Sequence, residues 1–309
     1  MNNKGKILLT GASGFVGHHA AKRLVSEGYD LVLFLKTGDD QKFFRDLGIK
    51  NIYAGDLAYG CLELKQAFSE HQFDAVVHLA ALIKAPWSEF QQVNVDGTKF
   101  MAELAEAQLS VKHFVFTSTD FVLFDAANEY KESKRLSEVM LRETKKLPYT
   151  ILRPSPIYGS GDDKNLMSLL KIIKKMPVLP APTFMMYPVY VGDVVSAIVK
   201  VLESPNVIRK EYNIPGAPVM TFRQMLKYMR DALGKPCLLV PVPNWFFAWA
   251  VKIQEKILKT PVLNYYQVEK WGMNIPISAE DAIRDFGWKQ TPFSEGIKET
   301  VKDNRLTTG

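Results

Sequence analysis

The amino-acid sequence predicts an α/β protein built on a doubly wound parallel sheet, with a smaller α/β domain toward the C-terminus. The first observation is an alternation of short apolar runs with helical patterns between residues 7 and 152, which is typical of strand–helix–strand units. The second is a glycine-rich turn directly after the first apolar run. The third is the length, since 309 residues exceed what one compact core usually holds.

The glycine-rich turn, Thr10–Gly17, joins the first predicted strand to the first predicted helix. Gly11 allows a sharp bend, Gly14 lets the backbone approach a ligand without a Cβ in the way, and Gly17 permits close packing of helix on strand. The helix N-terminus adds free N–H groups and a partial positive charge. Three glycines also occur in ordinary tight turns, but their position after the first strand favours a dinucleotide site.

Six apolar runs are predicted to form the strands of the sheet: Ile7–Leu9, Leu31–Leu35, Asn51–Tyr53, Ala75–Leu79, His113–Thr117 and Thr150–Leu152. From Pro154 onward prolines cluster and the alternation stops, which marks a domain boundary. Val189–Glu203 has a strand pattern followed by an apolar-faced helix, so we expect the chain to return to the sheet there.

Two further helices are predicted from their ends. Thr221 and Ser278 are hydroxyl residues at the expected helix starts, and Gly234 and Gly287 are the expected stops. The predicted division of the chain places 1–157 and 186–212 in the dinucleotide-binding domain. Residues 158–185 and 213–309 form the smaller substrate domain, whose last helix is able to return to the larger one.

Composition narrows the class of protein. A hydrophobic fraction of 47% with 23% charged residues is ordinary for a soluble enzyme, and the net charge of +6 is spread thinly, so no nucleic-acid partner is expected. Cys61 and Cys237 lie far apart without a CxxC partner, which indicates neither a metal site nor a disulfide framework, and a reducing cytoplasm is the expected setting. The most apolar stretch, Leu238–Val251, contains prolines and is shorter than the ~20 residues of a membrane span.

Tyr130 and Lys134 are the candidate proton-transfer pair. They lie four residues apart in a run with a helical apolar face, so both project from one side of the helix. A nearby ammonium and a cationic nicotinamide would favour the phenolate, and such a tyrosine exchanges a proton with a substrate oxygen during hydride transfer. The spacing alone also fits an amphipathic surface helix.

The third candidate element is the strand end Thr117–Thr119. Ligands of a doubly wound sheet bind beyond the carboxyl ends of its strands, where a hydroxyl could hydrogen-bond the reacting oxygen. Serine and threonine also terminate strands without any function.

Together these motifs resemble the extended short-chain dehydrogenase/reductase family along nearly the whole chain. In chain order the matching motifs are Thr10–Gly17, Gly55–Leu57, His78–Ala81, Asn94 within Val93–Thr98, Ser118–Thr119, Tyr130 with Lys134, Leu152–Gly159, Val189–Asp193 and Phe286–Trp288. The resemblance implies an NAD(P)-binding Rossmann domain, a C-terminal substrate domain and a catalytic set of Thr119, Tyr130 and Lys134. Ser118 competes with Thr119 for the hydroxyl role.

The resemblance also implies which residues bind the cofactor. Asp56 and Leu57 would contact the adenine, and Ala80 and Ala81 would line the cofactor cleft. Lys134 would bind the nicotinamide ribose. The expected cofactor-binding set is Gly11, Ser13, Gly14, Phe15, Val16, Gly17, Lys36, Asp56, Leu57, Ala80, Ala81, Thr117, Tyr130, Lys134, Pro154 and Ile157.

One departure concerns the interval from Thr119 to Tyr130, which is shorter than in most extended members. Sugar-nucleotide 4,6-dehydratases carry an acid where this chain has Phe121, so dehydration is disfavoured. The same stretch is similar to that of dTDP-4-dehydrorhamnose reductase. The sequence as a whole resembles the dihydroflavonol reductase and 3β-hydroxysteroid dehydrogenase group. A nucleotide-sugar epimerase and a non-catalytic NAD(P)-binding regulator are the alternatives.

The cofactor is expected to be NADP(H), with NAD(H) as the alternative. The end of the second strand, Leu33–Thr37, lacks a carboxylate for the adenosine ribose, and Lys36 lies where a 2′-phosphate could be bound. A lysine at a strand end is also often merely solvated.

The substrate is expected to be a largely apolar ketone, aldehyde or alcohol, because Pro177–Val191 holds no charged residue. The side chains expected to wall an apolar pocket, or else to form the small domain's own core, are Phe184, Met185, Met186, Tyr187, Trp245, Phe246, Phe247 and Trp249. Arg209, Arg223 and Arg230 could still reach a substrate phosphate. A homodimer is expected through helices at 96–108 and 130–146, by resemblance to the family.

Overall fold

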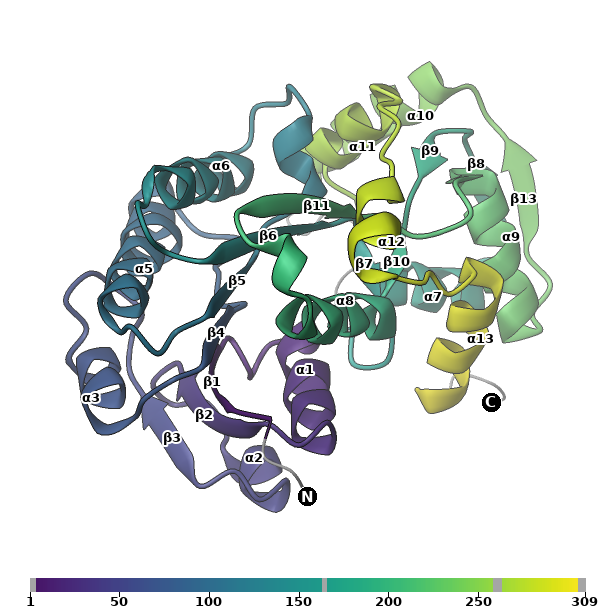
Figure 1. Ribbon diagram of the computed structural model, residues 1–309. Coiled ribbons are helices and arrows are strands. Elements are labelled where there is room, and N and C mark those ends of the chain that lie inside the picture. Colours follow the sequence, from purple (N-terminus) through teal and green to yellow (C-terminus); the bar gives the residue numbers. More distant parts are fainter. Residues whose placement is uncertain (1–3, 163–165, 258–262, 305–309) are drawn as a thin grey trace.

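The computed structural model describes residues 4–162, 166–257 and 263–304 and has the predicted α/β architecture (Figure 1). Its centre is a seven-stranded sheet in the order β11-β6-β5-β4-β1-β2-β3, in which all neighbouring strands are parallel. The strands are β1 (Lys6–Thr10), β2 (Asp30–Leu35), β3 (Asn51–Ala54), β4 (Ala75–His78), β5 (His113–Thr117), β6 (Tyr149–Pro154) and β11 (Lys210–Ile214). The strand order reverses direction between β1 and β4, where a doubly wound sheet opens a crevice for a ligand.

All six predicted strands are present, but the return of the chain to the sheet was predicted at the wrong place. β10 (Val189–Tyr190) pairs with β7 (Ile157–Tyr158) in a separate small sheet. The strand that rejoins the main sheet is β11, which pairs with β6 at the sheet edge. Its sequence, Lys-Glu-Tyr-Asn-Ile, alternates polar and apolar residues, so it lacks the continuous apolar run of the central strands.

Helices cover both faces of the main sheet (Figure 1). One face carries α1 (Phe15–Ser26) and α8 (Val191–Glu203), and the other carries α3 (Leu62–Glu70), α5 (Gly97–Ala107) and α6 (Glu129–Glu143). Alternate residues of β1 therefore enter different cores: Ile7 and Leu9 pack with the first pair of helices and Leu8 packs with the second group. Short helices α2 (Lys42–Asp46) and α4 (Trp87–Glu89) lie in the connections, and a π-helical stretch at Phe90–Asp96 runs directly into α5.

The second part of the molecule lies beyond the carboxyl ends of strands β6 and β11 (Figure 1). It contains two small sheets, one with β8 parallel to β13 and one with β9 antiparallel to β12. Its elements are α7 (Leu166–Lys175), β8 (Val178–Ala181), β9 (Met185–Met186), β12 (Met220–Thr221), α9 (Phe222–Leu233), β13 (Leu238–Pro241), α10 (Asn244–Ile257), α11 (Tyr265–Gly272) and α13 (Phe293–Asp303). Helix α12 (Glu280–Phe286) instead packs on β11, and its Ala282 and Phe286 belong to the same core as α1 and α8. A separate methionine-rich core is shared by α7, α9 and α13.

The predicted helix ends are largely confirmed. Thr221 accepts a hydrogen bond from the Gln224 N–H and forms a capping box with it at the start of α9. Gly234 and Gly287 end α9 and α12 in the left-handed conformation, each with φ of 61°. Ser278 is not the N-cap of α12, which begins at Glu280, although its hydroxyl accepts a hydrogen bond from the Glu280 N–H.

Candidate active site

The glycine-rich turn has the geometry of a phosphate-binding loop. Gly11 has a φ of 69°, and a Cβ there would lie 2.6 Å from the Ala80 nitrogen. A Cβ on Gly17 would lie 2.1 Å from the Gly11 carbonyl oxygen, so helix α1 packs on the turn as only glycine allows. Gly14 is exposed at the N-terminus of α1, and no side chain caps that terminus. The first-turn N–H groups, which include those of Phe15 and Val16, are therefore suited to a pyrophosphate.

The end of β2 carries a carboxylate that the sequence argument missed. Lys36 is exposed, as expected, but Asp39 folds back so that its Oδ2 accepts hydrogen bonds from the Ser13 hydroxyl at 2.5 Å and from the Lys36 N–H at 3.2 Å. Asp39 was overlooked because it follows the strand by several residues, across the turn at Gly38. The adenosine end of the crevice thus presents both a cation and a carboxylate.

The other expected cofactor residues gather at the same edge of the sheet, because each follows the carboxyl end of a parallel strand. Asp56 is exposed, whereas Leu57 is buried beneath Gly97 of α5. Ala80 and Ala81 are half-buried after β4, and the Ala80 N–H donates to the Thr10 hydroxyl. Pro154 is buried at the end of β6, and Ile157 is half-buried in β7.

Asn94 fixes the loop after β4 against helix α6. Its side-chain amide bonds both backbone groups of Leu82, accepting from the N–H at 2.8 Å and donating to the carbonyl at 3.0 Å. It also donates to the Ser133 hydroxyl, which in turn donates to the Tyr130 carbonyl. Asn94 lies in the π-helical stretch, a local widening that is frequent at functional sites. The arrangement positions the first turn of α6 relative to the cofactor crevice.

Tyr130 and Lys134 both lie in the first half of α6, but their surroundings differ. Burial raises the pKa of the Tyr130 phenol well above its usual value, and the nearby Asp120 and Tyr266 raise it further. This raised pKa favours the protonated phenol, whereas the phenolate expected from the sequence depends on an ammonium and a bound cationic nicotinamide.

Lys134 is almost completely buried, with 2% of its surface exposed, and its Nζ lies 4.2 Å from the centre of the Phe116 ring. Burial lowers the pKa of Lys134 to about 7, although the carboxylate of Glu138 acts in the opposite direction. Burial lowers the pKa of His78, and the nearby Lys134 lowers it further. The lysine thus lies against the ends of β4 and β5, where a cofactor ribose would be.

The strand-end hydroxyls have distinct roles. Thr119 caps a short 3₁₀ helix at Asp120–Leu123 by accepting a hydrogen bond from the Phe121 N–H at 3.2 Å. Thr117 and Ser118 have buried hydroxyl oxygens without a partner in the described part of the chain, and Ser155 after β6 has a third. Buried polar groups are rarely left unpaired, so these oxygens indicate a place where a ligand supplies the missing partners. Ser118 is therefore a stronger candidate for substrate contact than the sequence suggested.

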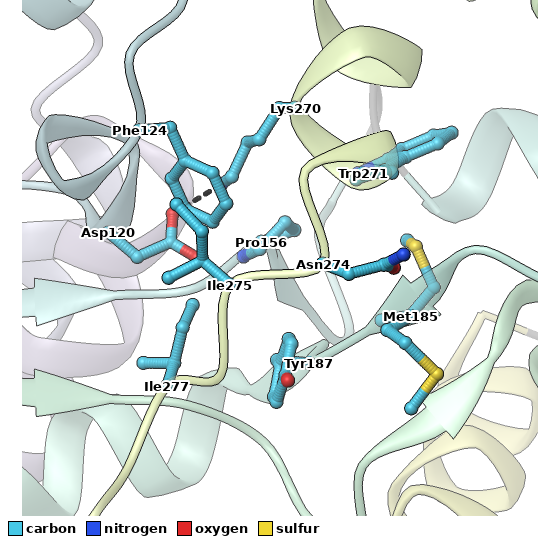
Figure 2. A pocket seen from close by; sticks show the side chains of 11 residues that line it. Asp120, Phe124, Pro156, Met185, Tyr187, Lys270, Trp271, Asn274, Ile275 and Ile277 are labelled. Carbon is cyan, nitrogen blue, oxygen red and sulfur yellow. Dashed lines mark hydrogen bonds and ion pairs between the residues drawn. The ribbon is translucent and has the colours of Figure 1, made fainter.

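A narrow pocket of about 20 Å³ lies between the segments that follow β5 and β6 and the helix α11 (Figure 2). Most of its lining is apolar: Phe124, Pro156, Met185, Met186, Tyr187, Trp271, Ile275 and Ile277. Its charged residues are Asp120, after β5, and Lys270, from α11, and the Asn274 amide and the Tyr187 hydroxyl are further polar groups. Lys270 Nζ donates to Asp120 Oδ1 at 2.5 Å, and the ammonium also lies 4.7 Å from the centre of the Phe124 ring.

The predicted aromatic wall of this pocket is only partly right. Met185, Met186 and Tyr187 line it, as expected. Phe184 and Phe247 are buried in a separate cluster where α10 and α11 meet, which matches the alternative of an ordinary core. Trp245, Phe246 and Trp249 were placed wrongly, because they lie exposed on the outside of α10. The residues that the sequence missed, above all Lys270 and Asp120, come together only through the fold, since 150 positions separate them.

The family model for the NAD-dependent epimerase/dehydratase family matches residues 7–215, which contain the crevice, Tyr130 and Lys134. The chain belongs to this family. It is accordingly an enzyme that works with a nicotinamide cofactor, as the motifs predicted. The match covers about two thirds of the chain and ends just beyond β11, so the rest of the substrate region lies outside it.

Three related proteins show the range of activities around this epimerase/dehydratase member. A ceramide reductase from Caulobacter vibrioides is 28% identical over 244 residues, covering 78% of this chain and 74% of the relative. A UDP-glucose 4-epimerase from Vibrio cholerae is 25% identical, covering 96% and 94%. Among solved structures, the Bordetella bronchiseptica enzyme WbmH in complex with NAD+ has a TM-score of 0.74 at 18% identity, covering 97% and 98%, which shows a shared fold.

Within the described ranges, the family member has no helix long and apolar enough to cross a membrane. The same residues contain no group of His, Cys, Asp or Glu side chains that could hold a metal ion.

Proposed function

We propose that this enzyme reduces or oxidises a small, largely apolar carbonyl or alcohol substrate with NADP(H), and that Tyr130 exchanges the proton with the substrate oxygen. The observation that carries the proposal is the lining of the pocket beside the nicotinamide end of the crevice. That lining consists of aromatic and aliphatic side chains around a single ion pair, Asp120 with Lys270. The free volume of about 20 Å³ holds no more than about one water molecule, so a substrate would have to displace part of this lining, and the surface it then meets is mostly apolar.

The charge of the pocket argues against a nucleotide sugar. A substrate diphosphate needs uncompensated cations, but Lys270 is the only cation in the described lining and Asp120 neutralises it. The three arginines that could have paired with a substrate diphosphate are hydrogen-bonded to other groups. Arg209 donates to the Leu147, Arg142 and Thr144 carbonyls, Arg223 donates to the Ala181 carbonyl, and Arg230 pairs with Asp231.

The proposed chemistry follows from the protonation states of the site. When bound, the nicotinamide cofactor supplies or accepts the hydride. Tyr130, whose pKa is raised by burial and by Asp120, holds a proton that it can donate to a carbonyl oxygen as charge develops there. The hydroxyls of Thr117 and Ser118, which have no partner among the described residues, would donate hydrogen bonds to the same substrate oxygen. Lys134, with a pKa of about 7, carries part of its positive charge at neutral pH and would bind the ribose.

The preference for NADP(H) rests on Lys36. Because Asp39 already accepts hydrogen bonds from Ser13 and from the Lys36 backbone, its carboxylate holds the loop that presents the Lys36 side chain. The lysine remains exposed and able to pair with a 2′-phosphate. The negative charge of Asp39 opposes that preference, so Lys36 and Asp39 together would determine the relative affinity for NADP(H) and NAD(H).

The relatives support two readings of the substrate. The name of the ceramide reductase indicates reduction of a lipid, which agrees with an apolar pocket. The name of the UDP-glucose 4-epimerase keeps a nucleotide-sugar epimerase as the second candidate. The third alternative from the sequence, a non-catalytic regulatory role, conflicts with membership of an enzyme family and with the retention of both Tyr130 and Lys134.

Thermal-shift and turnover assays on the NADPH-loaded enzyme test the proposal. Aromatic and alicyclic ketones are compared with UDP- and dTDP-sugars. We expect stabilisation and loss of nicotinamide absorbance with members of the ketone set. Stabilisation and turnover with a nucleotide sugar alone would overturn the proposal in favour of the epimerase.

A further inference from the structure

Helix α10 presents an apolar face to solvent. Trp245, Trp249, Ile253 and Ile257 follow one another at intervals of four residues, so they form one stripe along the helix. Trp245 is 73% exposed, Trp249 57% and Ile257 72%, and Phe246 at the edge of the stripe is also exposed. Exposed aromatic residues grouped in this way, rather than scattered singly, mark an interaction surface.

The opposite side of α10 already has a partner, so the outer stripe is not an unfinished part of the core. Phe247 and Val251 are buried against Phe184 and against Val268 of α11. The helix is therefore held in place by its inner face, while its outer face remains apolar and uncovered. Exposed apolar side chains continue into the preceding strand β13, where Leu238 is 63% exposed.

The charges on α10 indicate what covers this face. Lys256 is exposed on the same side as the tryptophans, whereas the exposed Lys252 places its ammonium over the ring of Tyr265, 5.1 Å from the ring centre. The single acidic residue of the helix, Glu255, is directed inward, where its carboxylate accepts a hydrogen bond from the Tyr265 N–H. The outer face thus combines aromatic residues with positive charge and carries no carboxylate of α10.

We propose that α10 docks this protein in the plane of a membrane surface that contains anionic phospholipids. Tryptophan is favoured at the boundary of headgroups and acyl chains, and lysines extend their ammonium groups to lipid phosphates. A helix with both on one face binds along such an interface. A second copy of the chain fits less well, because a two-fold contact would bring the lysines of both copies together without carboxylates to neutralise them.

The position of α10 connects the docking face to the pocket. Its inner face packs on α11, and α11 carries Lys270 and Trp271, which line the pocket. A membrane-bound orientation would hold the pocket one helix away from the lipid surface. The docking itself does not depend on the identity of the substrate, so it can be tested on the full chain without an activity assay.

The experiment is co-sedimentation of the full chain with vesicles of phosphatidylcholine and phosphatidylglycerol, compared with vesicles of phosphatidylcholine alone. We expect binding to the anionic vesicles that weakens with added salt. Trp245→Ser with Trp249→Ser should lower the partition coefficient about tenfold or more. Lys256→Gln should lower it about fivefold on anionic vesicles, with little effect on neutral ones. Trp87→Ser removes an exposed tryptophan outside α10 and serves as the matched control.

Quenching of the wild-type tryptophan fluorescence by brominated lipids would show that tryptophans enter the membrane interface, without any substitution. The proposal is overturned if the wild type does not bind anionic vesicles, or if the α10 variants bind as well as Trp87→Ser. It is also overturned if the wild type is a dimer that the double tryptophan variant dissociates, because the face would then be covered by a second copy.

Discussion

At the scale of single residues, Lys134 is the clearest case of a side chain that opposes stability. A nearly complete loss of solvent contact lowers its pKa to about 7, from about 10.4 for a free lysine. Below pH 7 the ammonium is charged in both the folded and the unfolded chain, and the folded chain bears the full cost of burying it. Between about pH 7 and pH 10 the unfolded chain holds more protons, so the stability conferred at this position rises with pH.

Lys134→Met should therefore raise the free energy of unfolding most at pH 6, and the gain should shrink as the pH approaches 10. Chemical unfolding at several pH values measures this, and Lys131→Met on the same helix is the control. A gain that is the same at all pH values would show that packing, and not charge, is responsible.

The proposed NADP(H) preference also depends on single residues. Lys36→Ala should weaken NADPH binding about 10- to 150-fold, because a charged hydrogen bond contributes about 1.5–3 kcal/mol, and should leave NADH binding nearly unchanged. Asp39→Asn should strengthen NADPH binding relative to NADH by removing a negative charge next to the phosphate. Dissociation constants for both cofactors measure these effects, and equal affinities in the wild type would contradict the NADP(H) preference.

At the scale of elements, the Asp120–Lys270 ion pair joins the segment after β5 to helix α11. Asp120 is 2% exposed and Lys270 is 9% exposed, so neither charge is well solvated. Removing one partner leaves the other charge buried, which typically costs about 3–5 kcal/mol, whereas replacing both by apolar residues is often close to neutral. The pair therefore specifies where α11 sits more than it stabilises the fold.

Lys270→Met alone should lower the free energy of unfolding by about 3 kcal/mol or more, and Lys270→Met with Asp120→Leu should restore much of the loss. Urea unfolding of the four proteins in this cycle is the measurement. Arg284→Met, which breaks an exposed ion pair, is the control. If Lys270→Met lowers the free energy of unfolding no more than Arg284→Met does, the assigned role is contradicted.

How much the sequence predicted also depends on the element. The central strands were found because they are continuous apolar runs buried on both faces, and Tyr130 and Lys134 were found because their spacing is local. β9 and β12 each have two residues, too few for a periodic signal. The pocket was found only in part because its two charges meet through tertiary packing.

At the scale of the whole molecule, the predicted homodimer stays a prediction. Phe100 and Met101 are buried against the protein's own sheet, but Leu136, Val139 and Met140 of α6 are only half-buried. A dimer through α5 and α6 would cover them. Sedimentation equilibrium should then show a dimer that Leu136→Lys weakens and Leu109→Lys does not, and a monomeric wild type at micromolar concentration would remove the proposal.

The fold brings the cofactor crevice and the first half of α6 to the carboxyl ends of the parallel strands, and Asp120, which lines the apolar pocket, is close enough to Tyr130 to raise its pKa. The most direct test is the rate of nicotinamide absorbance loss for Tyr130→Phe, on the ketone that the wild type reduces fastest, alongside NADPH affinity. The substitution removes only the transferable proton, so turnover should fall by at least about 100-fold while cofactor affinity and thermal stability are kept. Near wild-type turnover by Tyr130→Phe would show that another group donates the proton and that the proposed mechanism is wrong.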